Sequence, residues 1–184
     1  MIGRRNRQEI YGRREAGDRM VFRKAKKIEA EAVMDLYRTV MGAPFCTWDE
    51  SYPGETEIKG DLFSGTLYVL EENQDLIGAI SIVPENEIND FDCWKVKDHT
   101  REFARVVLRP DYQHKGLSVI LVEGIIRELQ KQNVAAIHIA VAKDNLPAQG
   151  LYRKMDFDFC GEADLYGHSF FLCEKILQTE KSEL

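Results

Sequence analysis

A glycine-containing turn between an apolar segment and an amphipathic segment is the first feature with clear chemical meaning. The apolar segment ends at Leu108, a proline and several polar residues follow, and Gly116 precedes a long stretch of helical periodicity. A helix that begins directly after such a turn directs free backbone N–H groups and the positive end of its dipole toward the turn, which suits an anionic phosphate. The sequence therefore predicts a phosphate-binding loop over residues 113–118.

A second helix with chemical interest begins at Asn145. Asparagine is a favoured N-cap, and Pro147 suits the first turn because its missing N–H has no partner there anyway. The apolar positions that follow recur at the spacing of one helical face: Ala148, Leu151, Tyr152 and Met155. An aromatic residue on such a stripe usually belongs to the core, so Tyr152 has a packing interpretation beside any chemical one.

The two segments together resemble the CoA-binding motifs of the GCN5-related N-acetyltransferases (GNAT). The first motif of the family holds the pyrophosphate of acetyl-CoA. It consists of an arginine or glutamine, two residues of any type, a glycine, one residue of any type, and a glycine or alanine. Gln113, Gly116 and Ser118 occupy those positions here. In the second, an asparagine precedes an alanine, a Leu-Tyr pair and a closing glycine, which Asp156 replaces. We expect Asp156 to adopt the left-handed conformation of that glycine with some strain.

The resemblance implies acetyl-CoA as the co-substrate and a site without metal. The pantetheine arm of acetyl-CoA would lie between the strands predicted at 102–108 and 135–141. A backbone N–H near Leu108 would polarise the thioester carbonyl. His114 and Lys115 would either add charge at the rim of the site or remain solvated loop residues. The residues expected around the co-substrate are Val106, Val107, Leu108, Gln113, His114, Lys115, Gly116, Leu117, Ser118, Asn145 and Tyr152.

Two side chains are the candidates for proton transfer. The resemblance implies that Tyr152 protonates the departing thiolate, and a phenol with an ordinary pKa near ~10 keeps its proton at neutral pH. Glu102 stands six residues before Leu108, where histone-type members of the family carry a glutamate base. The alternative is that Glu102 forms an ion pair with Arg101, Arg105 or a lysine, and a water relay would then replace it. A β-bulge near Arg105 would re-aim the side chains of this strand.

The acceptor site is expected at acidic and aromatic residues in the loops: Trp48, Tyr52, Asp90, Asp92 and Trp94. Such residues suit a cationic amine through charge and cation–π contact, although acidic loops are commonly only solvated. We expect a small-molecule primary amine as acceptor. The alternatives are a protein lysine or N-terminus, and a non-catalytic acyl-CoA-binding regulatory module, against which Tyr152 argues.

The remaining elements follow from hydrophobic periodicity. The predicted strands cover residues 21–25, 66–70, 76–83, 102–108, 135–141, 159–165 and 169–175; the predicted helices cover 28–41, part of 48–65, 117–132 and the segment after Asn145. This order indicates an α+β fold similar to that of GNAT enzymes. The resemblance implies a mixed, mostly antiparallel sheet with splayed central parallel strands and helices on both faces.

Composition limits the class of protein. The 184 residues include 44% hydrophobic and 30% charged residues, which is ordinary for a single globular domain. Four scattered cysteines indicate reduced thiols in a cytoplasm and argue against a zinc site. A net charge of −6 disfavours nucleic acid as a partner, and no apolar run is long enough for a membrane span. The oligomeric state stays open, with a homodimer as one alternative.

The N-terminal residues differ from the rest. Residues 1–19 carry six arginines against three acidic residues, and the first strand pattern begins only after Met20. We interpret them as a basic extension outside the fold that need not be ordered. It is either an arm that contacts a partner or the product of an upstream start codon, and GNAT chains, which typically begin near their first strand, favour the second. Residues 20–177 would form the domain and residues 178–184 a tail.

Overall fold

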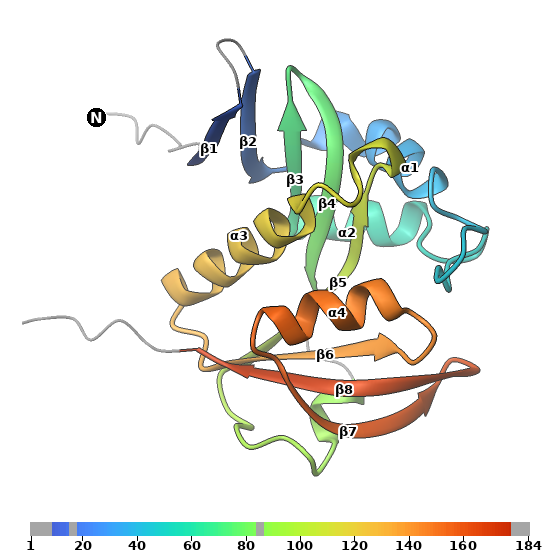
Figure 1. The fold of residues 1–184 in the computed structure, drawn as a ribbon, viewed down its shortest axis with the longest axis vertical. Coiled ribbons are helices and arrows are strands. Elements are labelled where there is room, and N and C mark those ends of the chain that lie inside the picture. The colour runs from blue at the N-terminus through green and yellow to red at the C-terminus, as the bar shows by residue number, and fades with distance from the viewer. Residues whose placement is uncertain (1–8, 15–17, 84–86, 178–184) are drawn as a thin grey trace, which may run out of the picture.

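An eight-stranded mixed sheet forms the centre of the protein (Figure 1). The computed structural model describes residues 9–14, 18–83 and 87–177. The strands are β1 (Glu9–Arg14), β2 (Asp18–Lys24), β3 (Leu67–Glu72), β4 (Asp75–Val83), β5 (Thr100–Leu108), β6 (Ala136–Ala142), β7 (Asp158–Leu165) and β8 (His168–Ile176). Their order across the sheet is β1-β2-β3-β4-β5-β6-β8-β7. Among the described strands β5 and β6 are the one parallel pair, which confirms the predicted fold class.

Helices cover both faces of the sheet. On one face α1 (Ala30–Arg38) and α2 (Glu55–Ser64) pack against β3 and β4, with the short 3-10 turn η1 (Lys27–Glu29) before α1. On the other face α3 (Leu117–Lys131) lies across β2 to β5, and α4 (Leu146–Lys154) lies over β6 in Figure 1. Two further 3-10 turns, η2 (Glu87–Asp90) and η3 (Pro110–Tyr112), lie on either side of β5 in the chain.

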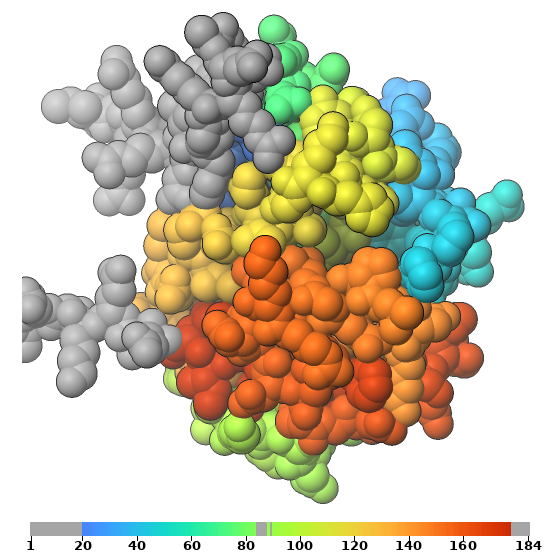
Figure 2. Space-filling model, in the orientation of Figure 1, coloured from blue at the N-terminus to red at the C-terminus, as the bar shows by residue number. Residues whose placement is uncertain are grey.

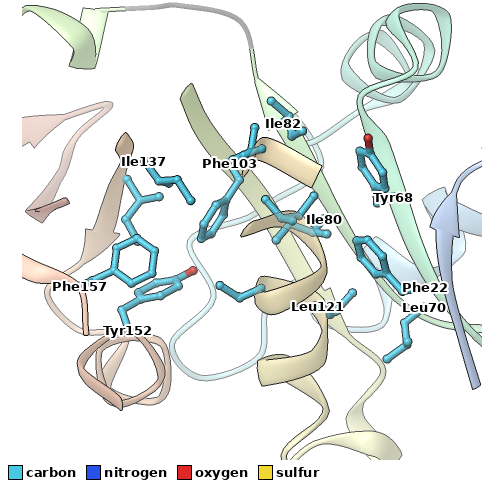
Figure 3. Packing of buried hydrophobic residues seen from close by; sticks show 14 of the residues in the cluster. Phe22, Tyr68, Leu70, Ile80, Ile82, Phe103, Leu121, Ile137, Tyr152 and Phe157 are labelled. Carbon is cyan, nitrogen blue, oxygen red and sulfur yellow. The ribbon is translucent and has the colours of Figure 1, made fainter. Parts of the chain in front are cut away.

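The apolar pattern explains these elements. Leu117, Leu121, Ile125 and Leu129 recur at helical spacing, and all four are buried at 2% exposure or less. Strand β4 has seven consecutive buried residues, from Ile77 to Val83, because helices cover both of its faces. The larger core cluster lies under α3 and α4 (Figure 3), and the smaller one lies under α1 and α2.

The beginning of the chain differs from the expectation. Residues 9–14, interpreted above as outside the fold, form the edge strand β1, and β2 begins at Asp18 rather than after Met20. Backbone pairing with the open edge of β2 requires no apolar pattern, so composition did not indicate this strand. Residues 1–8, 15–17 and 178–184 lie outside the described residues.

The feature that positions the site is the separation of the two central strands. Register pairs join residues 100–102 of β5 to residues 136–138 of β6, and the remaining residues of both strands are not paired with each other. Strand β6 pairs instead along its whole length with β8, from Ala136–Ile176 to Ala142–Phe170. Strand β5 therefore stays with β4 while β6 follows β8, and the two diverge toward their carboxyl ends (Figure 1).

Candidate active site

A groove of about 1730 Å³ opens where β5 and β6 separate. Residues 102–108 of β5 and 139–142 of β6 line its walls, and parts of α4, the loop before α2 and the β7–β8 hairpin border it. In Figure 2 a recessed surface lies between the yellow segment that leads into α3 and the orange α4, with the cyan loop around residue 50 at one end. The groove therefore collects side chains from most of the predicted site.

The predicted phosphate loop lies at one wall of the groove. Gly116 is the N-cap of α3 with a φ of +78°, and a Cβ built on it would meet nothing within 4 Å. The Gln113 side chain donates from Nε2 to the carbonyl oxygen of Leu108 at 3.0 Å, which ties the loop to the end of β5. The first N–H groups of α3 have no carbonyl partner within their own helix and point toward this loop. The open space at Gly116 and these amides fit a phosphate.

Other loop residues divide by what they contact. Gln113, His114, Gly116 and Ser118 line the groove. The Lys115 ammonium lies 4.9 Å from the ring centroid of Tyr112. Leu117 is buried in the core, so it can contribute only its backbone to a ligand.

Strand β5 contains a β-bulge at Arg105. Ser81 pairs with Ala104 and Ala79 with Val107, so two residues of β5, Arg105 and Val106, oppose the single residue Ile80 of β4. Arg105 has a φ of +53°, a left-handed conformation that is rare for this residue type. After the bulge Val106 packs against the larger core cluster and Val107 belongs to the smaller one. The bulge thus re-aims the residues that border the groove.

Tyr152 packs in the core while its hydroxyl borders the groove. Its ring centroid lies 5.9 Å from that of Phe103 and 5.4 Å from that of Phe157. The hydroxyl oxygen points away from α4, on the side where Phe103 lies (Figure 3). Among the described residues this hydroxyl has no hydrogen-bond partner, and burial raises the pKa of Tyr152 well above its usual value. The arrangement is compatible with both the packing and the proton-donor interpretations.

The two predicted features of the second motif are confirmed. Asn145 caps α4, because its side-chain oxygen accepts a hydrogen bond from the N–H of Ala148 at 3.1 Å. Asp156, which replaces the family glycine after the helix, has a φ of +57°.

Glu102 lies at the closed end of the groove. It pairs in register with Val83 of β4 and with His138 of β6, and it lines the groove. Arg105, one of its suggested ion-pair partners, binds Asp61 instead: the Nη2–Oδ2 distance is 2.7 Å. The ion-pair interpretation of Glu102 therefore loses one of its candidates.

The structure divides the predicted acceptor residues into two groups. Trp48 and Tyr52 line the groove beside α2. Asp90 and Asp92 are exposed outside it, and Asp92 forms an ion pair with Lys97 at 3.4 Å.

Trp94 is a core residue rather than part of a binding surface. Its exposure is 3%, its Nε1 donates to the carbonyl of Ile88 at 2.6 Å, and its ring stacks on His138 with centroids 4.1 Å apart. The acidic loop turns inward at Trp94 because β6 offers an apolar and aromatic surface there. Cation–π contact of Trp94 with an acceptor does not fit this burial.

Sequence reasoning missed two buried polar contacts, one an ion pair and the other a contact between a histidine and a carboxylate. One joins Arg105 to Asp61, and the other joins His138 to Glu174, with Nε2 and Oε1 3.2 Å apart. Burial lowers the pKa of His138, although Glu174 opposes this effect. The partners are 44 and 36 residues apart in the chain, so no local pattern could have revealed them.

Within residues 9–14, 18–83 and 87–177, no group of three or more His, Cys, Asp or Glu side chains is arranged to hold a metal ion. Among the described helices, none is long and apolar enough to cross a membrane.

Comparison with known proteins identifies the family. The profile of the acetyltransferase (GNAT) family matches residues 30–157, which include both motifs and the parted strands. The chain belongs to this family. GNAT acetyltransferases are enzymes that use acetyl-CoA, so the resemblance inferred from the two motifs is confirmed, as is the enzyme class.

Relatives of this GNAT chain include protein acetyltransferases. It is 38% identical over 53 residues to the [ribosomal protein bS18]-alanine N-acetyltransferase of Escherichia coli strain K12, a match that covers 29% of this chain and only 36% of that relative. The crystal structure of the ribosomal-protein-S18-alanine N-acetyltransferase from Escherichia coli superposes with a TM-score of 0.69 at 16% identity, covering 90% of this chain and 98% of the other. The PaiA N-acetyltransferase from Thermoplasma acidophilum, in complex with coenzyme A, gives 0.68 at 17% identity, with 86% and 99% covered. These structural likenesses establish the GNAT fold.

Proposed function

We propose that this GNAT acetyltransferase transfers the acetyl group of acetyl-CoA to a primary amine of a polypeptide, with Tyr152 as general acid and Glu102 as base. The observation that carries the proposal is the groove between the parted strands. It brings the phosphate loop, the hydroxyl of Tyr152 and the end of Glu102 to one opening of about 1730 Å³.

Each step of the proposed reaction is assigned to a group that lines or borders this groove. The loop at residues 113–118 and the N-terminus of α3 would hold the pyrophosphate of acetyl-CoA. The unpaired stretch of β5 offers backbone groups to the pantetheine arm, and an N–H near Leu108 would polarise the thioester carbonyl.

Proton transfer completes the reaction. The amine nitrogen bonds to the thioester carbon while Glu102, directly or through a water, takes the amine proton. The carbon–sulfur bond then breaks, and the Tyr152 hydroxyl gives its proton to the departing thiolate. The raised pKa of Tyr152 keeps that proton in place at neutral pH.

Two observations favour a polypeptide acceptor over the small molecule expected from the sequence. The named relative acts on an alanine of a ribosomal protein. In addition, the groove continues past the parted strands to the loop at 43–52 and to the β7–β8 hairpin, which leaves room for an extended segment.

The test is acetyl-CoA binding followed by an acceptor panel. Calorimetry should detect acetyl-CoA binding at micromolar to millimolar concentration. Thiol release should then be fastest with peptides that carry a free N-terminus, slower with N-terminally blocked peptides that carry lysine, and slowest with polyamines and aminoglycosides. Faster turnover of a small amine than of every peptide would restore the small-molecule acceptor, and failure to bind acetyl-CoA would overturn the proposal altogether.

A further inference from the structure

A buried ion pair forms the floor of the acceptor side of the groove. The Arg105 guanidinium makes three contacts with Asp61 of α2: Nε to Oδ2 at 3.0 Å, Nη2 to Oδ1 at 2.8 Å and Nη2 to Oδ2 at 2.7 Å. Both side chains are only 8% exposed. This two-pronged geometry holds the guanidinium in one orientation.

The remaining nitrogen of that guanidinium, Nη1, contacts Tyr52. The Nη1 of Arg105 donates to the Tyr52 hydroxyl oxygen at 3.2 Å. Tyr52 is 41% exposed and lines the groove, and its backbone exchanges two hydrogen bonds with Asp49, at 3.1 and 3.3 Å. Both the ring and the main chain of Tyr52 are therefore held in place.

The direction of this hydrogen bond determines what Tyr52 can do. An arginine N–H only donates, so the phenol oxygen accepts, and the phenol's own hydrogen must point elsewhere. Among the described residues, the Tyr52 hydroxyl has one hydrogen-bond partner, Arg105, so no described side chain accepts the phenol hydrogen. The hydroxyl of Tyr52 thus presents one donor to the groove.

This arrangement is costly to fold. Arg105 occupies a left-handed conformation in the middle of a strand, with a φ of +53°, and two charges are removed from water. Strained backbone and buried ion pairs of this kind add little stability and are common beside functional sites. Their joint result here is a fixed phenol hydroxyl at the acceptor end of the groove.

We propose that Asp61 and Arg105 position the Tyr52 hydroxyl to donate a hydrogen bond to a carbonyl oxygen of the acceptor, next to its amine. This inference rests on the proposed acetyl transfer and specifies its acceptor: an amine followed by an amide carbonyl, as at a peptide N-terminus. Because Asp61 neutralises Arg105, the site suits a neutral carbonyl rather than a free carboxylate. Asp61 and Arg105 are positioning residues, and Tyr52 determines specificity.

The test compares two acceptors with each protein. One is a short peptide amide with a free N-terminus, and the other is an alkylamine of similar size without a carbonyl. For Tyr52→Phe we expect kcat/KM to fall about three- to tenfold for the peptide amide, the effect of losing one hydrogen bond, and to stay within about twofold for the alkylamine. The ratio of variant to wild type for each acceptor removes the difference in amine basicity, and the Kd of acetyl-CoA should not change.

The positioning role needs a charge-neutral variant. Asp61→Asn combined with Arg105→Gln removes both buried charges and should lower the kcat/KM of the peptide amide as Tyr52→Phe does, mainly through KM. Tyr112→Phe is the matched control, because its hydroxyl bonds Glu72 and Tyr112 is not among the residues that line the groove, and it should leave the acceptor preference unchanged. Tyr52→Phe removes only an exposed hydroxyl, so it remains informative even if the double variant does not fold.

The outcomes separate this inference from the function on which it rests. A wild-type protein that acetylates neither acceptor would overturn both. A wild-type protein that acetylates the peptide amide, with a Tyr52→Phe variant that loses the same factor on both acceptors or on neither, would overturn only the role of Tyr52. A rise in the Kd of acetyl-CoA would move Tyr52 to the co-substrate side and would also overturn it.

Discussion

Glu102 and His138 form the last register pair between β5 and β6 before the two strands separate. Residues paired in parallel strands point to the same face of a sheet, so this pair marks the closed end of the groove. His138 is buried there beneath Trp94, while Glu102 borders the opening. Glu102, the proposed base, therefore lies at this end of the groove.

Glu102→Gln tests that assignment because it keeps the shape and removes the charge. As a lost general base, it should lower turnover by about 10²- to 10⁴-fold at neutral pH. Turnover should partly recover at higher pH, where more of the amine is already deprotonated. The measurement is a pH–rate profile beside a melting curve of the same variant. A wild-type profile with a lower melting temperature would assign Glu102 to a structural ion pair.

Tyr152→Phe removes one proton donor and keeps the ring that packs on Phe103 and Phe157. We expect turnover to fall by about 10²-fold or more, the usual contribution of a general acid. The Kd of acetyl-CoA and the melting temperature should change little. Steady-state kinetics and calorimetry on the variant check this, and an unaltered turnover would leave Tyr152 with its packing role alone.

Gly116→Ala should weaken acetyl-CoA binding beyond what backbone strain explains. The added methyl group meets no protein atom within 4 Å, so it would occupy the space that a phosphate needs. Gly42→Ala is the matched control, since Gly42 has a φ of +74°, against +78° at Gly116, and equally open surroundings. Both variants should lose about 1–2 kcal/mol of stability from the left-handed conformation.

Calorimetry distinguishes the two glycine variants. Gly116→Ala should raise the Kd of acetyl-CoA by about tenfold, equivalent to about 1.4 kcal/mol, and Gly42→Ala should leave it unchanged. Equal Kd values for the two variants would remove Gly116 from the phosphate site.

Gly124→Ala should destabilise the fold although alanine is the better helix former. A Cβ at this position of α3 would lie 2.6–2.7 Å from ring atoms of Phe22, which is buried and stacks on Tyr68 with centroids 5.4 Å apart. Overpacking costs about 1–3 kcal/mol, which exceeds or offsets the helix gain of about 1 kcal/mol.

Gly150→Ala in α4 is the control for this packing effect. A Cβ there meets nothing within 4 Å, so the variant should gain up to about 1 kcal/mol from helix propensity. Urea denaturation of both variants gives the comparison. A Gly124→Ala variant as stable as Gly150→Ala would show that Phe22 moves aside freely.

The buried His138 predicts a pH dependence of stability. Burial lowers its pKa in the folded state, so the unfolded chain binds the extra proton first as the pH falls below about 6.5. The free energy of unfolding should therefore be highest above that pH and should decrease as the pH falls from 7 toward 5.

His138→Gln isolates this effect, because glutamine can still donate to Glu174 but does not titrate. Its free energy of unfolding should vary less between pH 7 and 5 than that of the wild-type protein. His168→Gln changes an exposed histidine and should keep the wild-type slope. Equal slopes for His138→Gln and the wild-type protein would contradict the assignment.

The sequence by itself determined most elements and the two local motifs. The amphipathic period of residues 117–131, the apolar runs of β4 and β6 and the cap at Asn145 are encoded within a few residues of where they act. The phosphate loop is equally local, because one turn and one helix terminus create it. For the same reason the left-handed conformation of Asp156 could be predicted, whereas the bulge at Arg105 was only raised as an option.

Only the tertiary structure decided which of these elements meet. The separation of β5 from β6 depends on β8 pairing with the full length of β6, although α4 and β7 lie between these two strands in the chain. Asp61 reaches Arg105 from a different helix, and Trp94 turns into the core because His138 lies beneath it. Such contacts join residues about 40 positions or more apart. Hydrophobic periodicity and intrinsic propensity act over one or two turns of the chain, so they do not indicate which distant elements pack together. The acceptor side of the groove is formed by such packing.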